Sequence, residues 1–222
     1  MRNKPTAPWI RGSVIVFTLA GLLTPLLGCA TAPAATGPRP AAWATPIAAN
    51  PGLPNLHRVN ANLYRSAQPT PEGFVFLGTH TSLSKADQPI KTVVSLRAFN
   101  EDAPLVPKTS LLRLEQIRFK TWHPEDEDVV KFLRIATTPA RQPVLVHCQH
   151  GSDRTGTMVA IYRIAYEGWS KAQATDEMVK GGFGYHPIWQ NLLRYIDALD
   201  IDAIKAQVAQ QGAWTVPPRG TP

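Results

Sequence analysis

One stretch in the second half of the sequence limits the fold of this chain more than any other. Residues 144–146 form a short apolar run, Val-Leu-Val, that is typical of a buried strand, and residues 155–167 have the composition of a helix. The loop between them brings backbone N–H groups to the N-terminus of the helix, where unpaired donors and the helix dipole favour an anion. The stretch therefore predicts a strand–loop–helix unit that holds a phosphate or a similar anion.

The same loop places a cysteine and an arginine six positions apart, Cys148 and Arg154. The field that favours an anion also favours the thiolate of Cys148, which is the nucleophilic form of cysteine. The planar guanidinium of Arg154 can hold two phosphate oxygens at once. We therefore expect Cys148 to be a nucleophile, and a buried structural cysteine before a helix is the alternative. The phosphate would lie against the loop residues, which are Gln149, His150, Gly151, Ser152, Asp153 and Arg154.

The pattern His-Cys-x-x-Gly-x-x-Arg-Thr-Gly at residues 147–156 resembles the active-site loop of the cysteine-dependent protein tyrosine phosphatases, in particular their compact dual-specificity branch. Residues 63–69, Leu-Tyr-Arg-Ser-Ala-Gln-Pro, are similar to the opening segment of bacterial, plant and fungal members of this branch. The loop of the sulfur transferases would bring the arginine one residue closer, so that family fits less well. The resemblance extends over residues 56–204 and implies a dual-specificity phosphatase-like fold.

This resemblance implies a defined chemistry, in which phosphomonoesters are hydrolysed through a phosphocysteine intermediate with no cofactor and no metal. Cys148 would attack phosphorus, Arg154 and the loop amides would hold the oxygens, and the hydroxyl of Thr155 would donate to the departing sulfur. We expect His147 to orient the loop through a backbone hydrogen bond rather than to act as a base. A zinc site on His147, Cys148 and His150 is not expected, because the remaining histidines are scattered singly along the sequence.

The proton donor of this family is an aspartate on the loop that precedes the helix before the cysteine. The matching segment here is His-Pro-Glu-Asp-Glu-Asp at residues 123–128. We choose Asp126 as the general acid, with Glu125 next and Asp128 third. Acidic residues at a helix start also complement the helix dipole without any catalytic role, which is the alternative for this cluster. The segment is shorter than the familiar family spacing, so its register stays open.

The variable positions of the loop bear on the substrate. Relatives that act on inositol polyphosphates tend to carry lysines there, whereas this loop has none; its variable residues are Gln149, His150, Ser152 and Asp153. One strong cation suits a phosphomonoester better than a highly charged polyphosphate. We therefore expect protein phosphotyrosine as the substrate, with phosphoserine and phosphothreonine next. A small-molecule phosphatase acting on inositol or nucleotide phosphates and a non-catalytic phosphate-binding module are the alternatives.

Residues 1–28 have the pattern of an export signal. A basic start is followed by an apolar run over residues 14–27, which is too short for a comfortable membrane span. The run ends at Leu-Leu-Gly-Cys, which resembles the lipobox of bacterial lipoproteins, so we expect cleavage before Cys29 and lipidation of this cysteine. An ordinary secretory signal cut near Ala34 or Ala35 is the alternative. The expected location is the periplasm, with a lipid anchor in a bacterial membrane, the outer membrane first.

Removal of the signal changes both the charge and the thiols of the chain. It takes away Arg2, Lys4 and Arg11 and lowers the formal net charge from +7 to +4, which suits anionic substrates. The sequence has no basic stripe with interleaved aromatic residues, so nucleic acid is not an expected partner. With Cys29 lipidated, Cys148 is the remaining thiol, and a lone thiol in an oxidising compartment suggests a chemical role. The expected partners are phosphorylated envelope or membrane-associated proteins.

The chain divides into four parts: a signal peptide at 1–28, an Ala/Pro-rich tether at 29–54, a phosphatase domain at 55–208 and a tail at 209–222. Order is expected from about Leu56. The periodicity of apolar residues predicts strands at 63–66, 91–97, 116–120 and 144–146, and helices at 71–77, 129–136, 155–167, 170–180 and 188–208. Strands that alternate with helices predict an α/β domain, with a mainly parallel central sheet flanked by helices.

Overall fold

The computed structural model describes residues 39–47, 52–79, 83 and 88–210. The predicted signal peptide, Cys29 and residues 211–222 of the predicted tail lie outside this part of the chain. Within the part that is described, none of the helices is both long enough and apolar enough to cross a bilayer.

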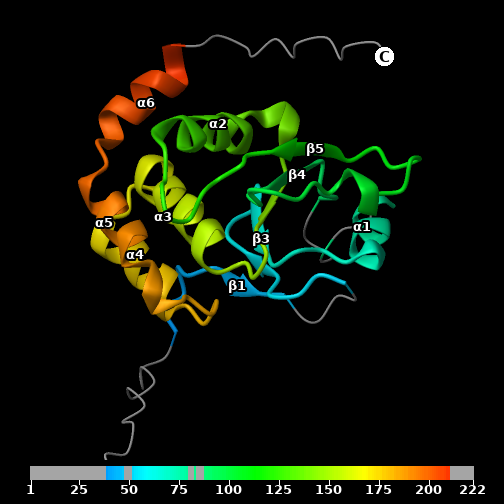
Figure 1. Ribbon diagram of the computed structural model, residues 1–222, viewed down its shortest axis with the longest axis horizontal. Helices are drawn as coiled ribbons and strands as arrows, with labels where there is room; N and C mark the ends of the chain where they lie inside the picture. The colour runs from blue at the N-terminus through cyan, green and yellow to red at the C-terminus, as the bar shows by residue number, and fades with distance from the viewer. Residues whose placement is uncertain (1–38, 48–51, 80–82, 84–87, 211–222) are drawn as a thin grey trace, which may run out of the picture. The chain divides into compact units, whose positions relative to one another are not determined.

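In the described chain a six-stranded sheet forms the centre of the fold (Figure 1). Its strands, in their order across the sheet, are β1 (Thr45–Pro46), β2 (His57–Arg58), β3 (Leu63–Ser66), β6 (Val144–His147), β4 (Thr92–Ser95) and β5 (Arg113–Gln116). The four strands from β3 to β5 pair in parallel, and β1 and β2 add an antiparallel edge. The predicted α/β fold with a mainly parallel sheet is therefore confirmed.

The middle position of β6 brings several loops to one edge of the sheet. Ser66, His147 and Ser95 are register partners at the last positions of β3, β6 and β4. Because the carboxyl ends of parallel strands meet at the same edge, the segments that follow these strands converge there. Cys148 comes directly after β6, so the predicted phosphate loop begins at the centre of this edge.

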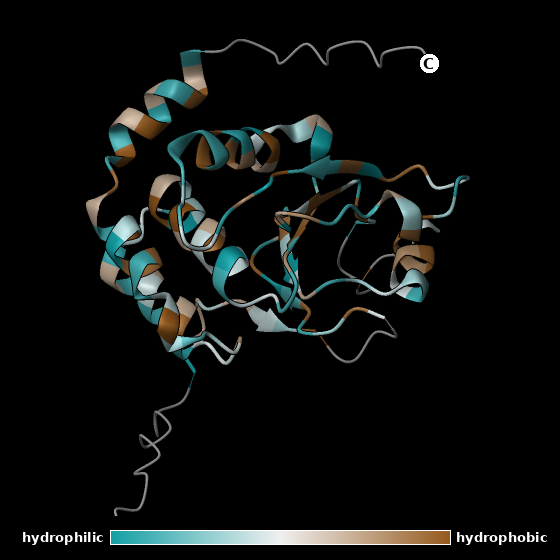
Figure 2. Cartoon of the chain, in the orientation of Figure 1, coloured by the Kyte–Doolittle hydropathy of each residue, from teal (hydrophilic) through white to brown (hydrophobic). Residues whose placement is uncertain are grey.

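Side chains alternate across the sheet and fill two apolar clusters. Val144 and Val146 pack with the cluster that the helices α2 to α6 share, whereas Leu145 between them packs with the cluster around α1. The helices are α1 (Pro71–Gly78), α2 (Asp126–Thr137), α3 (Asp153–Glu167), α4 (Lys171–Lys180), α5 (Gln190–Ala198) and α6 (Ile201–Gln210). Figure 2 shows both apolar and polar residues along the outer helices such as α2 and α5, as expected of amphipathic helices, whereas α3 is buried on most sides.

The helices follow the sequence-based prediction closely, and their ends have visible causes. α4 begins after Ser170, whose hydroxyl accepts from the Gln173 backbone N–H at 3.2 Å while the Gln173 side chain accepts from the Ser170 N–H at 2.9 Å. α3 begins at Asp153 rather than at Thr155 and ends at Gly168, which has a left-handed φ of 73°. The predicted last helices are a 3₁₀ turn at Pro187–Trp189 followed by α5 and α6.

The predicted strand at 116–120 is wrong in its position. The observed strand β5 covers Arg113–Gln116, and the alternation that predicted the strand continues beyond it, with Ile117 and Phe119 buried. The ladder ends because β4 ends at Ser95, which accepts from the Ile117 N–H at 2.9 Å. The Phe119 N–H then donates to the carbonyl of Ile117 at 2.8 Å, which turns the chain out of the sheet.

Residues 39–47, which we call the strap, are ordered, although order was expected only from about Leu56. The strap contains β1, which pairs with β2 at the edge of the sheet. Ala44 is fully buried, and its backbone N–H donates to Oε1 of Glu177 at 2.5 Å. Arg39 donates to the carbonyl of Gly181 and lies over the ring of Phe183 at 5.4 Å. The strap is therefore packed on the end of α4 and on the segment that follows it.

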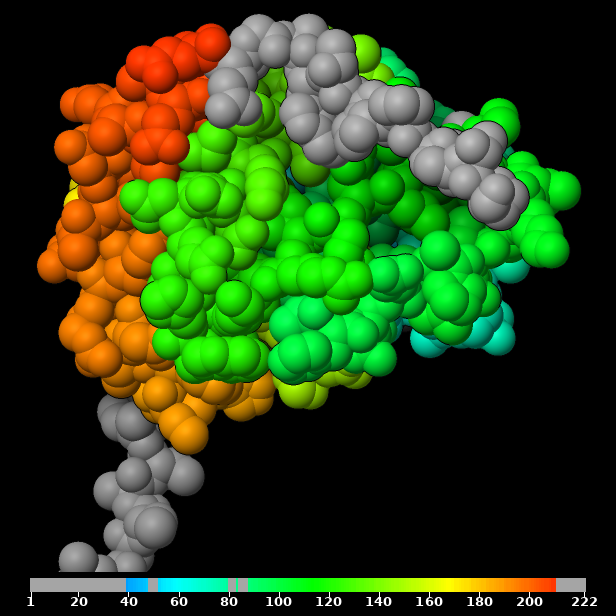
Figure 3. All heavy atoms as spheres, turned by 45° about the horizontal axis from the view of Figure 1, so that its top comes forward, coloured from blue at the N-terminus to red at the C-terminus, as the bar shows by residue number. Residues whose placement is uncertain are grey.

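The C-terminal helices pack against α2. The Tyr195 hydroxyl on α5 donates to Oδ1 of Asp126 at 2.8 Å, and Arg134 on α2 donates to the carbonyl of Gln207 on α6 at 2.5 Å. Figure 3 shows the orange and red helices α5 and α6 lying directly against the green segment that contains α2. This packing fixes the start of α2, where the candidate acids lie.

Candidate active site

Cys148 lies at the base of the predicted phosphate loop. It directly follows β6, its side chain is 2% exposed, and α3 begins at Asp153. The structure therefore confirms the strand–loop–helix arrangement that the sequence predicts. The first N–H groups of α3 have no partner inside the helix, so the helix presents donors to the loop from its N-terminus.

The loop carbonyls are held from outside by three neighbouring groups. The Gln149 carbonyl accepts from the Gln68 N–H at 3.3 Å, and the His150 carbonyl accepts from Nδ2 of Asn55 at 2.9 Å. In the same way, Arg65 Nη2 donates to the Gly151 carbonyl at 2.8 Å. Because the C=O of one residue and the N–H of the next point in opposite directions across a trans peptide, the three N–H groups that follow point away from these outer partners.

Those N–H groups are free to bind an anion. Among the residues that the structure describes, no hydrogen bond is donated by the backbone amides of residues 149–152. Gly151 and Ser152 are buried, and buried backbone donors are normally paired, so free ones here mark a ligand site. The loop thus forms a cradle of main-chain donors above Cys148, which suits the oxygens of a phosphoryl group.

Gly151 is required for the shape of this cradle. Its φ is 71°, in the left-handed region, and a Cβ at this position would lie 2.6 Å from both the carbonyl carbon and oxygen of Ser66. The end of β3 therefore packs directly on the loop. Any side chain at position 151 would strain the backbone and push the loop away from β3.

The two charged residues at the end of the loop point in different directions. Arg154 is half-buried, and its Nη1 donates to the carbonyl of Leu96, just after β4, at 3.4 Å. Asp153 is turned toward His186, which donates to it from its backbone N–H at 2.9 Å and lies 2.8 Å away through Nδ1. The carboxylate of Asp153 is therefore engaged outside the cradle, and the guanidinium of Arg154 is the cation within the loop itself.

His147 is fixed by a partner that sequence reasoning missed. Its Nε2 lies 2.7 Å from Oδ2 of Asp102, and both side chains are buried. Its Nδ1 is 3.3 Å from the carbonyl of Cys148, and its predicted loop-orienting role stays a prediction. Gln68 donates to Oδ1 of Asp102 at 3.0 Å and accepts from Arg97 at 2.7 Å. No local sequence signal marks Asp102, because its partner lies 45 residues away.

Hydrogen bonds and nearby positive charge lower the pKa of Asp102. Burial, the largest influence, raises the pKa of Asp102, but the hydrogen bonds and charge of His147, the hydrogen bond from Gln68 and the charge of Arg97 outweigh it. The pKa of Asp102 therefore lies below its usual value, and the carboxylate is charged at neutral pH.

Thr155 is buried in the first turn of α3, and its hydroxyl has no hydrogen-bond partner among the described residues, Cys148 included. A buried hydroxyl without a partner is unfavourable by about 1–3 kcal/mol. Its predicted role toward the departing sulfur stays a prediction.

The three candidate acids have different surroundings. Asp126 is exposed at the first position of α2 and accepts from Tyr195, whose pKa is raised by burial and by this carboxylate. Glu125 lies 3.2 Å from Nζ of Lys120. Asp128 is buried, and burial raises its pKa above the usual value, which is the direction that a general acid needs. The choice of Asp126 stays a prediction, and the structure adds an argument for Asp128.

Two exposed aromatic rings lie on the segments that leave β4 and β5. Phe99 and Trp122 are 79% and 57% exposed, and their rings stack with centroids 6.2 Å apart. The carboxyl ends of β4 and β6 share an edge, so this aromatic pair belongs to the same side of the sheet as the loop.

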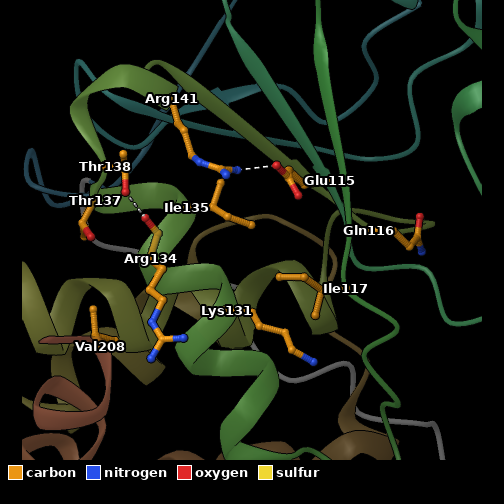
Figure 4. Close-up of a pocket in the computed structure, with 10 residues that line it drawn as sticks. All are labelled: Glu115, Gln116, Ile117, Lys131, Arg134, Ile135, Thr137, Thr138, Arg141 and Val208. Carbon is orange, nitrogen blue, oxygen red and sulfur yellow. Dashed lines mark hydrogen bonds and ion pairs between the residues drawn. The ribbon is translucent and has the colours of Figure 1, made fainter. Parts of the chain in front are cut away.

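A separate pocket of about 550 Å³ lies between β5, α2 and α6 (Figure 4). Arg141 in this pocket is paired with Glu115, and the pocket contains neither a cysteine nor a free amide run. Its lining residues are Glu115, Gln116, Ile117, Lys131, Arg134, Ile135, Thr137, Thr138, Arg141 and Val208. None of them belongs to the phosphate loop, which therefore remains the site with the chemistry of a phosphatase.

Comparison with known proteins agrees with this geometry. The family described as "DSP-PTPase phosphatase fused to NAD+ Kinase" matches residues 52–190. The dual specificity protein phosphatase TpbA of Pseudomonas aeruginosa is 33% identical over 94% of this chain and 88% of its own length. A crystal structure of a TpbA variant in complex with phosphotyrosine has a TM-score of 0.63 at 32% identity, and covers 78% of this chain and all of that one.

A more distant relative is the inositol diphosphatase SIW14 of Saccharomyces cerevisiae, which is 26% identical over 72% of this chain and 56% of its own length. The matched family model and the TpbA relatives span the loop, the sheet and the helices described above. This chain belongs to the dual-specificity branch of the cysteine-dependent protein tyrosine phosphatases. It is a cysteine-dependent phosphatase.

Proposed function

We propose that this phosphatase hydrolyses phosphomonoesters on proteins, phosphotyrosine first and phosphoserine or phosphothreonine next. The observation that carries the proposal is the cradle of free main-chain amides above Cys148. The thiolate of Cys148 forms a bond to phosphorus while the bond to the ester oxygen breaks, and an aspartate of α2 gives its proton to that oxygen. Water then attacks the phosphocysteine and gives a proton back to the aspartate, and inorganic phosphate leaves as the thiolate is restored.

Two features support a phosphopeptide over a small polyphosphate. The loop contributes one strong cation, Arg154, and has no lysine. Its acidic residue, Asp153, is paired with His186. The exposed pair of Phe99 and Trp122 offers apolar area on the same side of the sheet, which suits an aromatic phosphoester and its flanking peptide. The similarity to TpbA, a dual specificity protein phosphatase, points in the same direction.

Hydrolysis of small-molecule phosphates is the second candidate, supported by the similarity to the inositol diphosphatase SIW14. A substrate panel distinguishes the two. We expect kcat/KM for phosphotyrosine peptides to exceed that for inositol phosphates and pyrophosphates by at least about tenfold, because the ratio of kcat/KM values reports how much better the site binds one transition state than the other. The reverse order would replace the first proposal with the second.

The same panel tests the mechanism. Cys148→Ser is expected to remove turnover of every substrate in the absence of metal, because the serine hydroxyl has no base to ionise it here. Turnover that survives in Cys148→Ser would reject the phosphocysteine route. Retained binding of inorganic phosphate would show that this variant keeps its cradle.

We further propose that Cys29 is lipidated and that the domain works in the periplasm, anchored to a bacterial membrane, the outer membrane first. The basic start, the short apolar run and the Leu-Leu-Gly-Cys motif of residues 26–29 support this proposal. Its substrates would then be phosphorylated envelope or membrane-associated proteins.

A further inference from the structure

Arg65 is a fully buried cation that the catalytic chemistry described so far does not use. It is 1% exposed, it lies in β3, and its register partner in β6 is Val146, two positions before Cys148. A guanidinium in such a place has lost its water, which is strongly unfavourable unless other groups compensate for it. Its contacts therefore indicate what it does.

The contacts of Arg65 are to the loop and to one ring. Nη2 donates to the carbonyl of Gly151 at 2.8 Å, and the guanidinium carbon lies 3.5 Å from the ring centroid of Phe183. Nε has no hydrogen-bond partner among the described residues. The guanidinium thus lies between the phosphate loop and the segment after α4, and one of its donors is unused.

Arg65 also lacks the carboxylate that a buried arginine normally has. Within the described part of the chain no acid forms an ion pair with it, whereas the buried Arg163 holds both Glu167 and Glu177 at 2.6 to 2.8 Å. Burial lowers the pKa of Arg65 to about 10, and the negative charges of Glu177 and of a Cys148 thiolate act in the opposite direction. Arg65 is therefore still charged at neutral pH, on a strand that pairs with the strand leading into Cys148.

We propose that Arg65 is a positioning residue of the active site, which holds the Gly151 carbonyl away from the cradle and supplies a buried positive charge that stabilises the Cys148 thiolate. By holding that carbonyl outward, it directs the next N–H, that of Ser152, toward the phosphoryl group. This inference deepens the proposed function and rests on Cys148 as the nucleophile.

The role differs from that of Arg154. Arg154 is half-buried and belongs to the loop, so it is placed to bind substrate oxygens. Arg65 is closed off from solvent and acts through the loop backbone and through its field. The other titratable groups around the loop are the His147–Asp102 pair, His150, and Asp153 with its partner His186. These groups stay in place when Arg65 is changed.

The test measures the thiol directly, in the full chain with Cys29→Ala so that Cys148 is the sole cysteine. The rate of alkylation by iodoacetamide is followed against pH, and binding of inorganic phosphate is measured by calorimetry. In Arg65→Met we expect the midpoint of the alkylation profile to rise by about one pH unit, the effect of one nearby charge at partial screening. We expect the Kd for phosphate to rise about tenfold, because one cradle donor loses its orientation.

Arg163→Met is the matched control, since it removes a second buried arginine that does not contact the loop. It should lower Tm and leave the alkylation midpoint and the phosphate Kd unchanged. An unchanged midpoint in a folded Arg65→Met, or an equal shift in Arg163→Met, would overturn the proposal. Neither measurement uses a substrate, so a wrong substrate assignment cannot produce either result.

Arg65→Lys keeps the test decisive if Arg65→Met does not fold. Lysine retains the charge but not the planar fork that reaches a carbonyl and lies on a ring at once. We expect its alkylation midpoint to stay near that of the parent chain while phosphate binding weakens. Phosphate binding as tight as in the parent chain would overturn the positioning role.

Discussion

At the scale of single residues, the phosphate loop is held by groups that lie outside it. Its three successive carbonyls are bound by Gln68, Asn55 and Arg65, all of which lie before residue 70 in the sequence. The nucleophile therefore depends on contacts from the first third of the domain. Changes at these distant positions should alter the loop without touching the substrate.

The general acid can be identified by substituting single residues of α2. We expect Asp126→Asn to slow hydrolysis of phenyl phosphate by about 10²–10⁴-fold, the usual effect of losing a general acid. The loss should be much smaller for p-nitrophenyl phosphate, because its leaving group needs little proton donation. Asp128→Asn is the matched control and should slow both substrates alike and slightly.

The opposite pattern would move the assignment to Asp128, whose burial raises its pKa. An equal loss on both substrates in both variants would mean that the two aspartates serve the structure of α2 alone. The dependence on the leaving group thus separates proton donation from a merely structural effect.

The sequence is informative where the chemistry is local. Cys148, Arg154 and the glycine of the loop occupy one short segment, so their spacing alone predicts the cradle. Asp102 and Arg65 were not singled out, because their contacts to the loop join residues 45 and 86 positions apart. Only the folded sheet brings such pairs together, and a single sequence contains no signal for them.

At the scale of elements, the segment after β4 is tied to β6 by the buried pair of Asp102 and His147. The lowered pKa of Asp102 means that this pair contributes stability above the unfolded value of about 4 and loses it as the pH falls through the folded value. We expect Asp102→Asn to lower the free energy of unfolding at pH 7 by about 3–5 kcal/mol. Urea unfolding at pH 7 and at pH 3 measures this difference.

At pH 3 the difference between Asp102→Asn and the parent chain should be smaller, because the Asp102 carboxyl of the unfolded chain is then largely protonated and the contribution of its lowered folded pKa is partly lost. A difference of the same size at both values of pH would contradict this account of the pair. Asp126→Asn is a useful comparison, since Asp126 is exposed and its loss should change the unfolding free energy little.

Element positions were predictable where side-chain periodicity and backbone hydrogen bonding agree, as in α4 with its Ser170 cap. They were not predictable where the periodicity continues beyond the backbone hydrogen bonds. Ile117 and Phe119 keep the alternation of a strand, yet β4 ends at Ser95, so the ladder stops at the Ile117 N–H and Phe119 bonds within its own segment. The two-residue strands β1 and β2 are too short for any periodicity to reveal.

At the scale of the whole molecule, the proposed lipid anchor predicts where the enzyme is found. Cys29→Ala should move the phosphatase from the membrane fraction to the soluble periplasmic fraction of bacterial cells, because the diacyl chains provide the attachment. Fractionation followed by an activity assay on phosphotyrosine peptide measures the change. Activity per molecule should be unaltered, since Cys29 is not part of the catalytic loop.

Cleavage of an ordinary secretory signal near Ala34 or Ala35 would instead place both the parent chain and Cys29→Ala in the soluble fraction. That result would contradict the lipid anchor. The control is Cys148→Ser, which is inactive and is therefore located with an antibody; it should remain in the membrane fraction. This pair of variants separates attachment from catalysis.

The strap changes how the catalytic domain must be delimited. Ala44 covers Glu177, and Arg39 covers Phe183, whose ring in turn supports the guanidinium behind the nucleophile. A fragment trimmed to the sequence-based boundary at residue 55 would lose this lining and leave a buried acid and an aromatic ring open to water. Recombinant work on the isolated enzyme should therefore retain the residues from 39 onward.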